Sequence, residues 1–182
     1  MKILITYFSQ TGNTEKIAQA IHEHVSNNHE SHLKTIKKVK IEDLEDYDLV
    51  FIGSACHDSD LAKPVLKFLK KLPNSPKYAI AGFYTHSTYL PEGDDRIKEL
   101  SERWSGKGIA TFEALKEKKK INFKGYFRCQ GIPSLPIEQF IHKTIIKDDE
   151  EWIEFIEEVK KHPNENDIED AKKFAQTILS EF

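Results

Sequence analysis

Apolar runs of strand length alternate along this chain with amphipathic helical stretches. The clearest run, residues 47–53, reads Tyr-Asp-Leu-Val-Phe-Ile-Gly, and its four consecutive apolar residues indicate a strand buried on both faces of a parallel sheet. Strands separated by helices need crossovers, and right-handed crossovers build a doubly wound sheet with helices on both faces. We therefore predict an α/β fold whose five parallel strands have the order 2-1-3-4-5.

The same pattern predicts where each element lies. Strands are expected at 2–8, 33–39, 47–53, 78–84 and 123–130, and helices at 13–25, from about 64, and at 94–119, 149–161 and 167–179. Gly106 and Gly108 are expected to break or bend the stretch 94–119. A capping box from Asn166 to Glu169 is expected to open the last helix. In such a sheet ligands bind beyond the carboxyl ends of the first and third strands.

The length suits a single domain over 1–182, somewhat larger than a minimal sandwich of this kind. Residues 132–162 exceed what the five-stranded plan needs. We expect an extra ordered element there, packed on the sheet edge or over the crevice, because its predicted helix carries an apolar stripe that must be buried against something: Trp152, Phe155, Ile156 and Val159.

Charge and composition exclude some partners. The formal net charge of −3 gives no reason to expect nucleic acid or an anionic membrane as a partner. No apolar run reaches the length of a membrane-spanning helix or resembles a secretory signal, so the cytoplasm is the default expectation. Cys56 and Cys129 stand alone, without the close spacing of a zinc or iron–sulfur site, and we expect no metal.

The loop at 9–14 carries the most chemical information. It reads Ser-Gln-Thr-Gly-Asn-Thr and joins a buried strand to an amphipathic helix, so its hydroxyls and backbone N–H groups meet the positive end of a helix dipole. Such a turn binds anions. It lacks the lysine of an NTPase loop and the three glycines of a dinucleotide loop. A loop of hydroxyls and amides without a cation suits a single phosphate monoester.

Here the chain resembles the flavodoxin family, whose FMN-phosphate loop reads Thr/Ser-x-Thr-Gly-x-Thr directly after the first strand. Ser9, Thr11, Gly12 and Thr14 match that motif at every defined position. The resemblance implies a flavodoxin-like fold and non-covalent FMN. It also implies that the phosphate is held by the whole loop: Ser9, Gln10, Thr11, Gly12, Asn13 and Thr14.

The resemblance extends to two further loops, which in flavodoxins contact the flavin ring. The loop after the third strand supplies Ser54, Ala55, Cys56 and His57. The loop after the fourth supplies Thr85, His86, Ser87 and Tyr89. His57 and Tyr89 are the candidates for stacking on the ring, whereas Trp104 and Trp152 are expected to be packing residues. The segments 127–131 and 162–165 resemble flavodoxin-like proteins common in anaerobic microbes.

The resemblance implies an FMN-dependent electron-transfer protein whose partners are redox proteins or a small-molecule electron acceptor. The alternative is a flavodoxin-like FMN-dependent oxidoreductase, of the NAD(P)H:quinone reductase or porphyrinogen-oxidase type, with 132–162 shaping a substrate site. A third reading is a flavin-free binding module. A phosphoacceptor receiver is disfavoured because Gly53 and Ser54 stand where it needs an aspartate. No catalytic residues are assigned, and the oligomeric state stays open.

Overall fold

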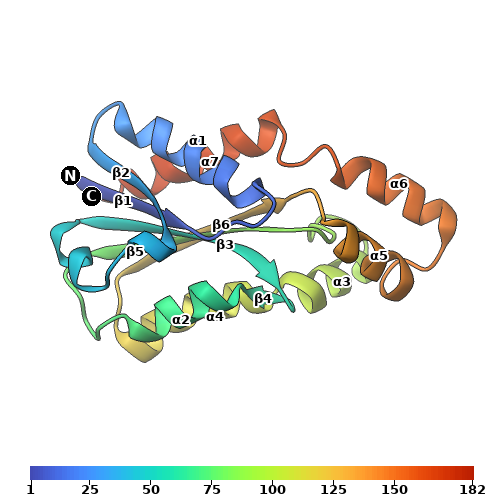
Figure 1. The fold of residues 1–182 in the computed structure, drawn as a ribbon, viewed down its shortest axis with the longest axis horizontal. Coiled ribbons are helices and arrows are strands. Elements are labelled where there is room, and N and C mark those ends of the chain that lie inside the picture. The colour runs from blue at the N-terminus through green and yellow to red at the C-terminus, as the bar shows by residue number, and fades with distance from the viewer.

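The computed structural model describes residues 1–182 as a parallel sheet with helices on both faces (Figure 1). The strands are β1 (Lys2–Tyr7), β2 (Glu30–Thr35), β3 (Leu49–His57), β5 (Ala79–His86) and β6 (Phe123–Gln130). They are parallel and follow the order β2-β1-β3-β5-β6, so the predicted topology is confirmed. A short strand, β4 (Asp60–Leu61), pairs antiparallel with the end of β3.

The helices form two outer layers and a separate group beyond the strand ends. Helices α1 (Asn13–Ser26) and α7 (Glu165–Leu179) cover one face of the sheet, and α2 (Lys63–Lys71) and α4 (Lys107–Lys119) cover the other (Figure 1). At the carboxyl ends of the strands lie α3 (Asp95–Ser105), α5 (Leu135–Thr144) and α6 (Asp149–Val159). Two 3-10 turns, η1 (Ile36–Lys38) and η2 (Glu42–Asp46), lead from β2 to β3. None of these helices is both long and apolar enough to span a membrane.

The core lies on both faces of the sheet, because successive strand side chains point to opposite sides. In β3, Val50 and Ile52 pack into the core under α2 and α4. Leu49 and Phe51 pack into the core under α1 and α7. The prediction that this strand is buried on both faces is therefore confirmed.

Several element boundaries differ from the prediction, most clearly at the second strand, the third strand and the last helix. The second strand is Glu30–Thr35 and not 33–39, because the apolar residue Ile36 begins η1 and is buried there as part of a turn. The third strand continues to His57, because pairing with β4 extends it into a hairpin. The last helix begins at Glu165, where the capping box consists of Asn164 and Asp167, not Asn166 and Glu169. The two possible capping boxes have the same spacing and overlap in the sequence, and the one nearer the N-terminus forms.

The stretch predicted as one broken helix is two helices, α3 and α4, which meet at Gly106. A Cβ atom at this position would collide with Glu102, so a glycine is required where the two helices join. The segment 132–162 holds two helices where one was expected. Helices α5 and α6 share a small core of their own, made of Ile141, Ile146, Phe155, Ile156 and Val159.

Candidate functional site

A cavity of about 620 Å³ lies at the carboxyl ends of β1, β3 and β5. Parallel sheets bind ligands at this switch point, where successive crossovers run to opposite sides. Four parts of the chain line the cavity: the loop before α1, the β3–β4 hairpin, the loop after β5, and α5 with the residues leading to it. Trp104 of α3 and Lys63 at the start of α2 also line it.

The loop before α1 presents an open helix N-terminus. Gly12 is the N-cap residue, with φ of 90°, a left-handed conformation that favours glycine. It has no side chain with which to cap the helix, and no other side chain caps it. The first backbone N–H groups of α1 therefore remain free to meet an anion. Ser9 shapes the turn by accepting a hydrogen bond from the Gly12 N–H at 3.1 Å.

Of the six residues predicted in this loop, the structure brings Gln10, Thr11 and Asn13 to the cavity. Ser9, Gly12 and Thr14 are not among its lining residues. The Thr14 side chain is buried, and its hydroxyl is hydrogen-bonded to that of Thr85 at 2.9 Å, which ties the start of α1 to the end of β5.

Asn13 links the loop to the segment that carries α5. Its side-chain amide donates to the Thr11 hydroxyl at 3.0 Å and to the Ile132 carbonyl at 2.8 Å. This approach needs a glycine at 131, since a Cβ there would lie 2.8 Å from the Asn13 side chain. Asn13 therefore fixes the loop before α1 relative to the segment that leads to α5.

The hairpin after β3 brings Ala55, Cys56 and His57 to the cavity, whereas Ser54 lies outside the lining. Ser54 accepts a hydrogen bond from the Ala62 N–H at 2.9 Å and so supports the hairpin from within. At the turn, Asp58 and Ser59 have φ of 51° and 70°. The residues 55–57, expected in a loop, belong to strand β3, because the hairpin continues the sheet beyond Gly53.

The hairpin is fixed to the end of α3 by two side chains. The Ser59 hydroxyl donates to the Arg103 carbonyl at 2.6 Å, and the Cys56 thiol donates to the Trp104 carbonyl at 3.7 Å. Burial, with a smaller contribution from Asp60, raises the pKa of Cys56 to about 12. The thiol is therefore protonated at neutral pH and is a poor nucleophile. Burial also lowers the pKa of His57, which keeps that ring uncharged.

The loop after β5 brings Thr85, His86, Ser87 and Thr88 to the cavity. Burial, and then the charge of Arg128, lower the pKa of His86 to about 3. The ring is neutral, and its Nδ1 accepts a hydrogen bond from the Thr88 N–H at 3.4 Å. The Ser87 hydroxyl donates to the Gly131 carbonyl at 2.7 Å, which joins this loop to the end of β6.

Tyr89, predicted to stack on a bound ring, lies outside the cavity lining. Its hydroxyl donates to Glu151, and its ring contacts Phe155 with centroids 4.8 Å apart. Glu151 also forms an ion pair with Arg96 at 2.8 Å. The structure thus places Tyr89 between the loop and α6, because the aromatic stripe of α6 offers it a packing surface. Trp152 also lies away from the cavity, stacked on His142 at 4.6 Å.

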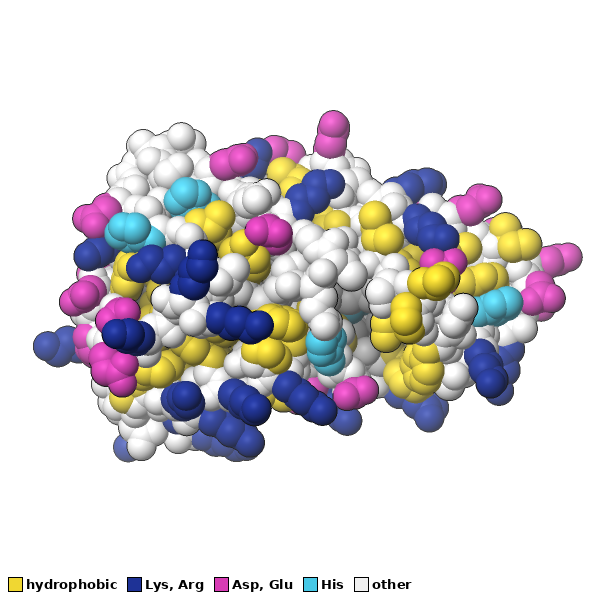
Figure 2. All heavy atoms as spheres, viewed as in Figure 1, with side chains coloured by type: hydrophobic (Ala, Val, Ile, Leu, Met, Phe, Trp, Pro, Cys, Tyr) yellow, Lys and Arg dark blue, Asp and Glu magenta, His cyan; other side chains and the backbone are white.

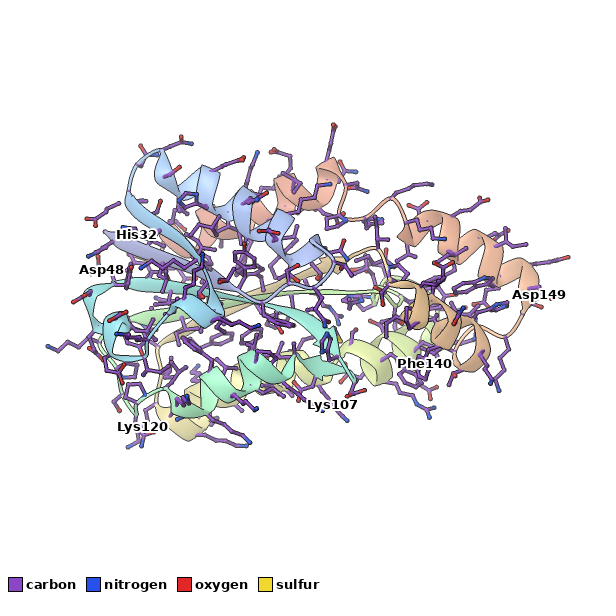
Figure 3. The ribbon with its side chains drawn as sticks, in the orientation of Figure 1. His32, Asp48, Lys107, Lys120, Phe140 and Asp149 are labelled. Carbon is purple, nitrogen blue, oxygen red and sulfur yellow. The ribbon has the colours of Figure 1, made fainter.

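Sequence reasoning missed the apolar side of the cavity. Trp104, expected to be a packing residue, lines it, and so do Ile137, Phe140 and Ile141 of α5. Figure 3 shows Phe140 extending from α5 toward α3, where its ring meets that of Trp104 with centroids 5.7 Å apart. A sequence signal was present: Ile137, Phe140 and Ile141 have helical spacing, and Pro136 suits a first turn.

Comparison with known proteins agrees with this architecture. The sequence model of the flavodoxin domain matches residues 4–176. An uncharacterised protein of Methanocaldococcus jannaschii is 32% identical over 185 residues, which cover 98% of this chain and 99% of that protein. The flavodoxin-like domain-containing protein BilS of Clostridioides difficile is 27% identical over 187 residues, which cover 98% of this chain and 97% of BilS.

Solved structures give the same fold. A flavodoxin from the domain Archaea superposes with a TM-score of 0.63 at 16% identity, covering 100% of this chain and 98% of that one. Oxidised flavodoxin 1 from Bacillus cereus superposes with a TM-score of 0.63 at 14% identity, covering 100% and 99%. With a domain match over nearly its whole length and a relative of the same length, this chain belongs to the flavodoxin family.

Proposed function

We propose that this chain binds FMN non-covalently in the cavity and transfers electrons through it. The observation that carries the proposal is the meeting, in one cavity, of the loop before α1 with the ends of β3 and β5. One end of that cavity offers an anion site, and the other offers uncharged surfaces that a flat ring system can contact.

The phosphate end fits a monoester. The N-terminus of α1 is uncapped, Thr11 faces the cavity, and a Cβ at Gly12 would meet nothing within 4 Å, so the space before the helix is open. Gln10, Thr11 and Asn13, with the backbone N–H groups beside them, are the residues that would hold the phosphate. No Lys or Arg lines this part of the cavity, so hydrogen bonds and the helix dipole would balance the charge.

The ring end fits a neutral, planar group. Ala55, Cys56 and His57 on one side and Thr85, His86 and Ser87 on another offer uncharged groups at neutral pH. Bound FMN would supply the redox chemistry, since isoalloxazine takes up one or two electrons. The chain's own residues would bind it, orient it and exclude water. Its redox partner would be another protein or a small-molecule electron acceptor.

The test compares FMN with riboflavin, which lacks the phosphate, in equilibrium titrations of the wild type and the variant Thr11→Val. The valine keeps the shape and removes the hydroxyl. FMN should bind about tenfold to hundredfold more weakly, because a hydrogen bond to a charged group contributes about 1.5–3 kcal/mol, while riboflavin affinity stays unchanged. Thr177→Val on the exposed side of α7 is the matched control. Equal weakening of both ligands would refute the phosphate assignment.

A second function is favoured by one observation, the apolar face that α5 turns to the cavity. A cavity with an apolar wall suits a flavodoxin-like FMN-dependent oxidoreductase, of the NAD(P)H:quinone reductase or porphyrinogen-oxidase type, better than a carrier whose flavin edge meets protein partners. Steady-state turnover separates the two. A carrier is reduced and reoxidised without a preferred small substrate, whereas an enzyme shows saturable turnover with one.

A further inference from the structure

The cavity has two walls of different chemistry. The loops at the strand ends give a polar wall of hydroxyls, amides and two histidines. The opposite wall, here called the outer wall, is formed by Trp104 of α3 and by Ile137, Phe140 and Ile141 of α5. The polar wall accounts for the phosphate and the polar edge of a flavin. The outer wall requires a separate explanation.

The outer wall is apolar surface that the protein leaves open. Ile137 and Phe140 line the cavity, yet they remain 47% and 44% exposed. Figure 2 shows apolar side chains gathered over α5 on this face of the molecule. The indole of Trp104 and the ring of Phe140 meet edge to face, with an interplanar angle of 75°, and join α3 to α5. Exposed apolar surface concentrated at a cavity marks a binding site.

The charges at the cavity restrict what can bind there. Lys63 is the one Lys or Arg among the lining residues, and Asp58 is the one Asp or Glu. Lys63 opens α2 directly after the β3–β4 hairpin and Asp58 lies at the hairpin turn, so none of the four outer-wall residues is charged, although the Arg103 guanidinium lies 5.5 Å from the centroid of the Trp104 ring. A pyrophosphate is held by a glycine-rich cradle or by several cations. No glycine lines the cavity, and beside the outer wall the Arg103 guanidinium stacks on the Trp104 ring. A nicotinamide dinucleotide therefore fits it poorly, whereas an uncharged aromatic molecule matches it.

We propose that Trp104, Ile137 and Phe140 form the binding wall for a second ligand, a flat, uncharged and largely apolar molecule of the quinone type. This inference rests on the proposed function, because the second ligand would lie in the same cavity as FMN. The three side chains determine specificity for that ligand and contribute little to holding the flavin.

The test uses calorimetric titration of FMN-loaded, oxidised protein, so that no electron transfer accompanies binding. Menadione is the apolar probe and NAD⁺ is the charged dinucleotide probe. Menadione should bind saturably and NAD⁺ should not. Trp104→Ala and Phe140→Ala should each weaken menadione about tenfold, the loss expected when a ligand can no longer bury its apolar surface against an aromatic wall. FMN affinity should change less than about twofold.

Ile153→Ala is the matched control, because Ile153 is an apolar residue 56% exposed on α6 and lies outside the cavity lining. Phe140 is partly exposed, so Phe140→Ala still tests whether the outer wall binds menadione if Trp104→Ala does not fold. Several outcomes would overturn the inference: menadione failing to bind the FMN-loaded wild type, NAD⁺ binding more tightly than menadione, or FMN and riboflavin weakening as much as menadione. Failure of the wild type to bind FMN would instead refute the proposed function.

Discussion

At the scale of single residues, burial determines the charge of two side chains that line the cavity. His86 is almost fully buried, and Cys56 is half-buried in the hairpin beside α3. Desolvation disfavours the charged form of each group, so it lowers the pKa of a histidine and raises that of a thiol. Both side chains are therefore neutral at physiological pH. Two neutral side chains here suit the proposed ligand FMN, whose charge lies at its phosphate.

The His86 ring gives a pH prediction. Its pKa is about 3 in the folded protein, against an ordinary value of 6.5. Between these values the unfolded chain binds a proton that the folded chain does not, so the free energy of unfolding should fall as the pH drops from about 6.5 toward 3. His86→Asn keeps an acceptor for the Thr88 N–H and does not titrate. Urea denaturation from pH 7 to 4 should show a shallower decline for the variant.

The comparison concerns the slopes of the two profiles, so any constant loss of stability in the variant does not affect it. Parallel profiles for wild type and His86→Asn would show that His86 is not a buried neutral group.

At the scale of elements, contact between neighbouring strands determines where small residues are required. Gly53 in β3 lies opposite Phe83 in β5. A Cβ at 53 would collide with that ring. Gly53→Ala should therefore lower the free energy of unfolding by about 1–3 kcal/mol through overpacking. In a Phe83→Leu background the same change should cost less, and a double-mutant cycle by urea denaturation measures the difference. Additive effects would contradict the packing seen between β3 and β5.

Helices α5 and α6 form a second, smaller packing unit beside the main core. Phe155 is 6% exposed and belongs to their shared cluster. Phe155→Ala should open this unit locally, so that amide exchange in 135–159 becomes on the order of 100-fold faster, as expected for a lost core phenylalanine. Amides of β1 and β3 should keep their protection. Ile153→Ala should change neither. Uniform acceleration across the sheet would show that the two helices unfold only with the whole protein.

The same elements show which structural features the sequence pattern predicts and which it does not. The fold, the exact span of β6 at 123–130 and the helix break at Gly106 follow from periodicity and glycine placement. Helix α5 was not predicted, although Pro136 occupies a position that suits proline in the first turn. The hairpin after β3 was also missed, since it depends on two non-glycine residues with positive φ, Asp58 and Ser59.

The site was predictable to the extent that local sequence determines it. Gln10, Thr11 and Asn13 reach the cavity because a turn of this composition between a strand and a helix can adopt few other conformations. Local sequence could not place Tyr89 and Trp104. Both are aromatic residues in the connection between β5 and β6, yet Trp104 lines the cavity and Tyr89 packs on Phe155. Their positions depend on where α5 and α6 pack, and those contacts join residues far apart in the chain.

At the scale of the whole molecule, the sheet brings three distant loops to one edge, and α5 encloses the space that they share (Figure 1). The loop before α1 belongs to the first crossover, and α5 follows the last strand. Asn13 and Ser87 each bond to the 131–132 backbone and so connect these parts. The arrangement places a polar wall and an apolar wall around one cavity, which is the site in which we propose that FMN binds.

The most direct measurement is the flavin content of the protein. The purified chain is incubated with excess FMN, freed of unbound ligand by gel filtration, and examined by visible absorption. The released flavin is then identified by chromatography after denaturation. We expect the absorption bands of protein-bound flavin and about one FMN for each chain, matching the cavity at the strand ends. A colourless protein that retains no FMN after this treatment would contradict the account.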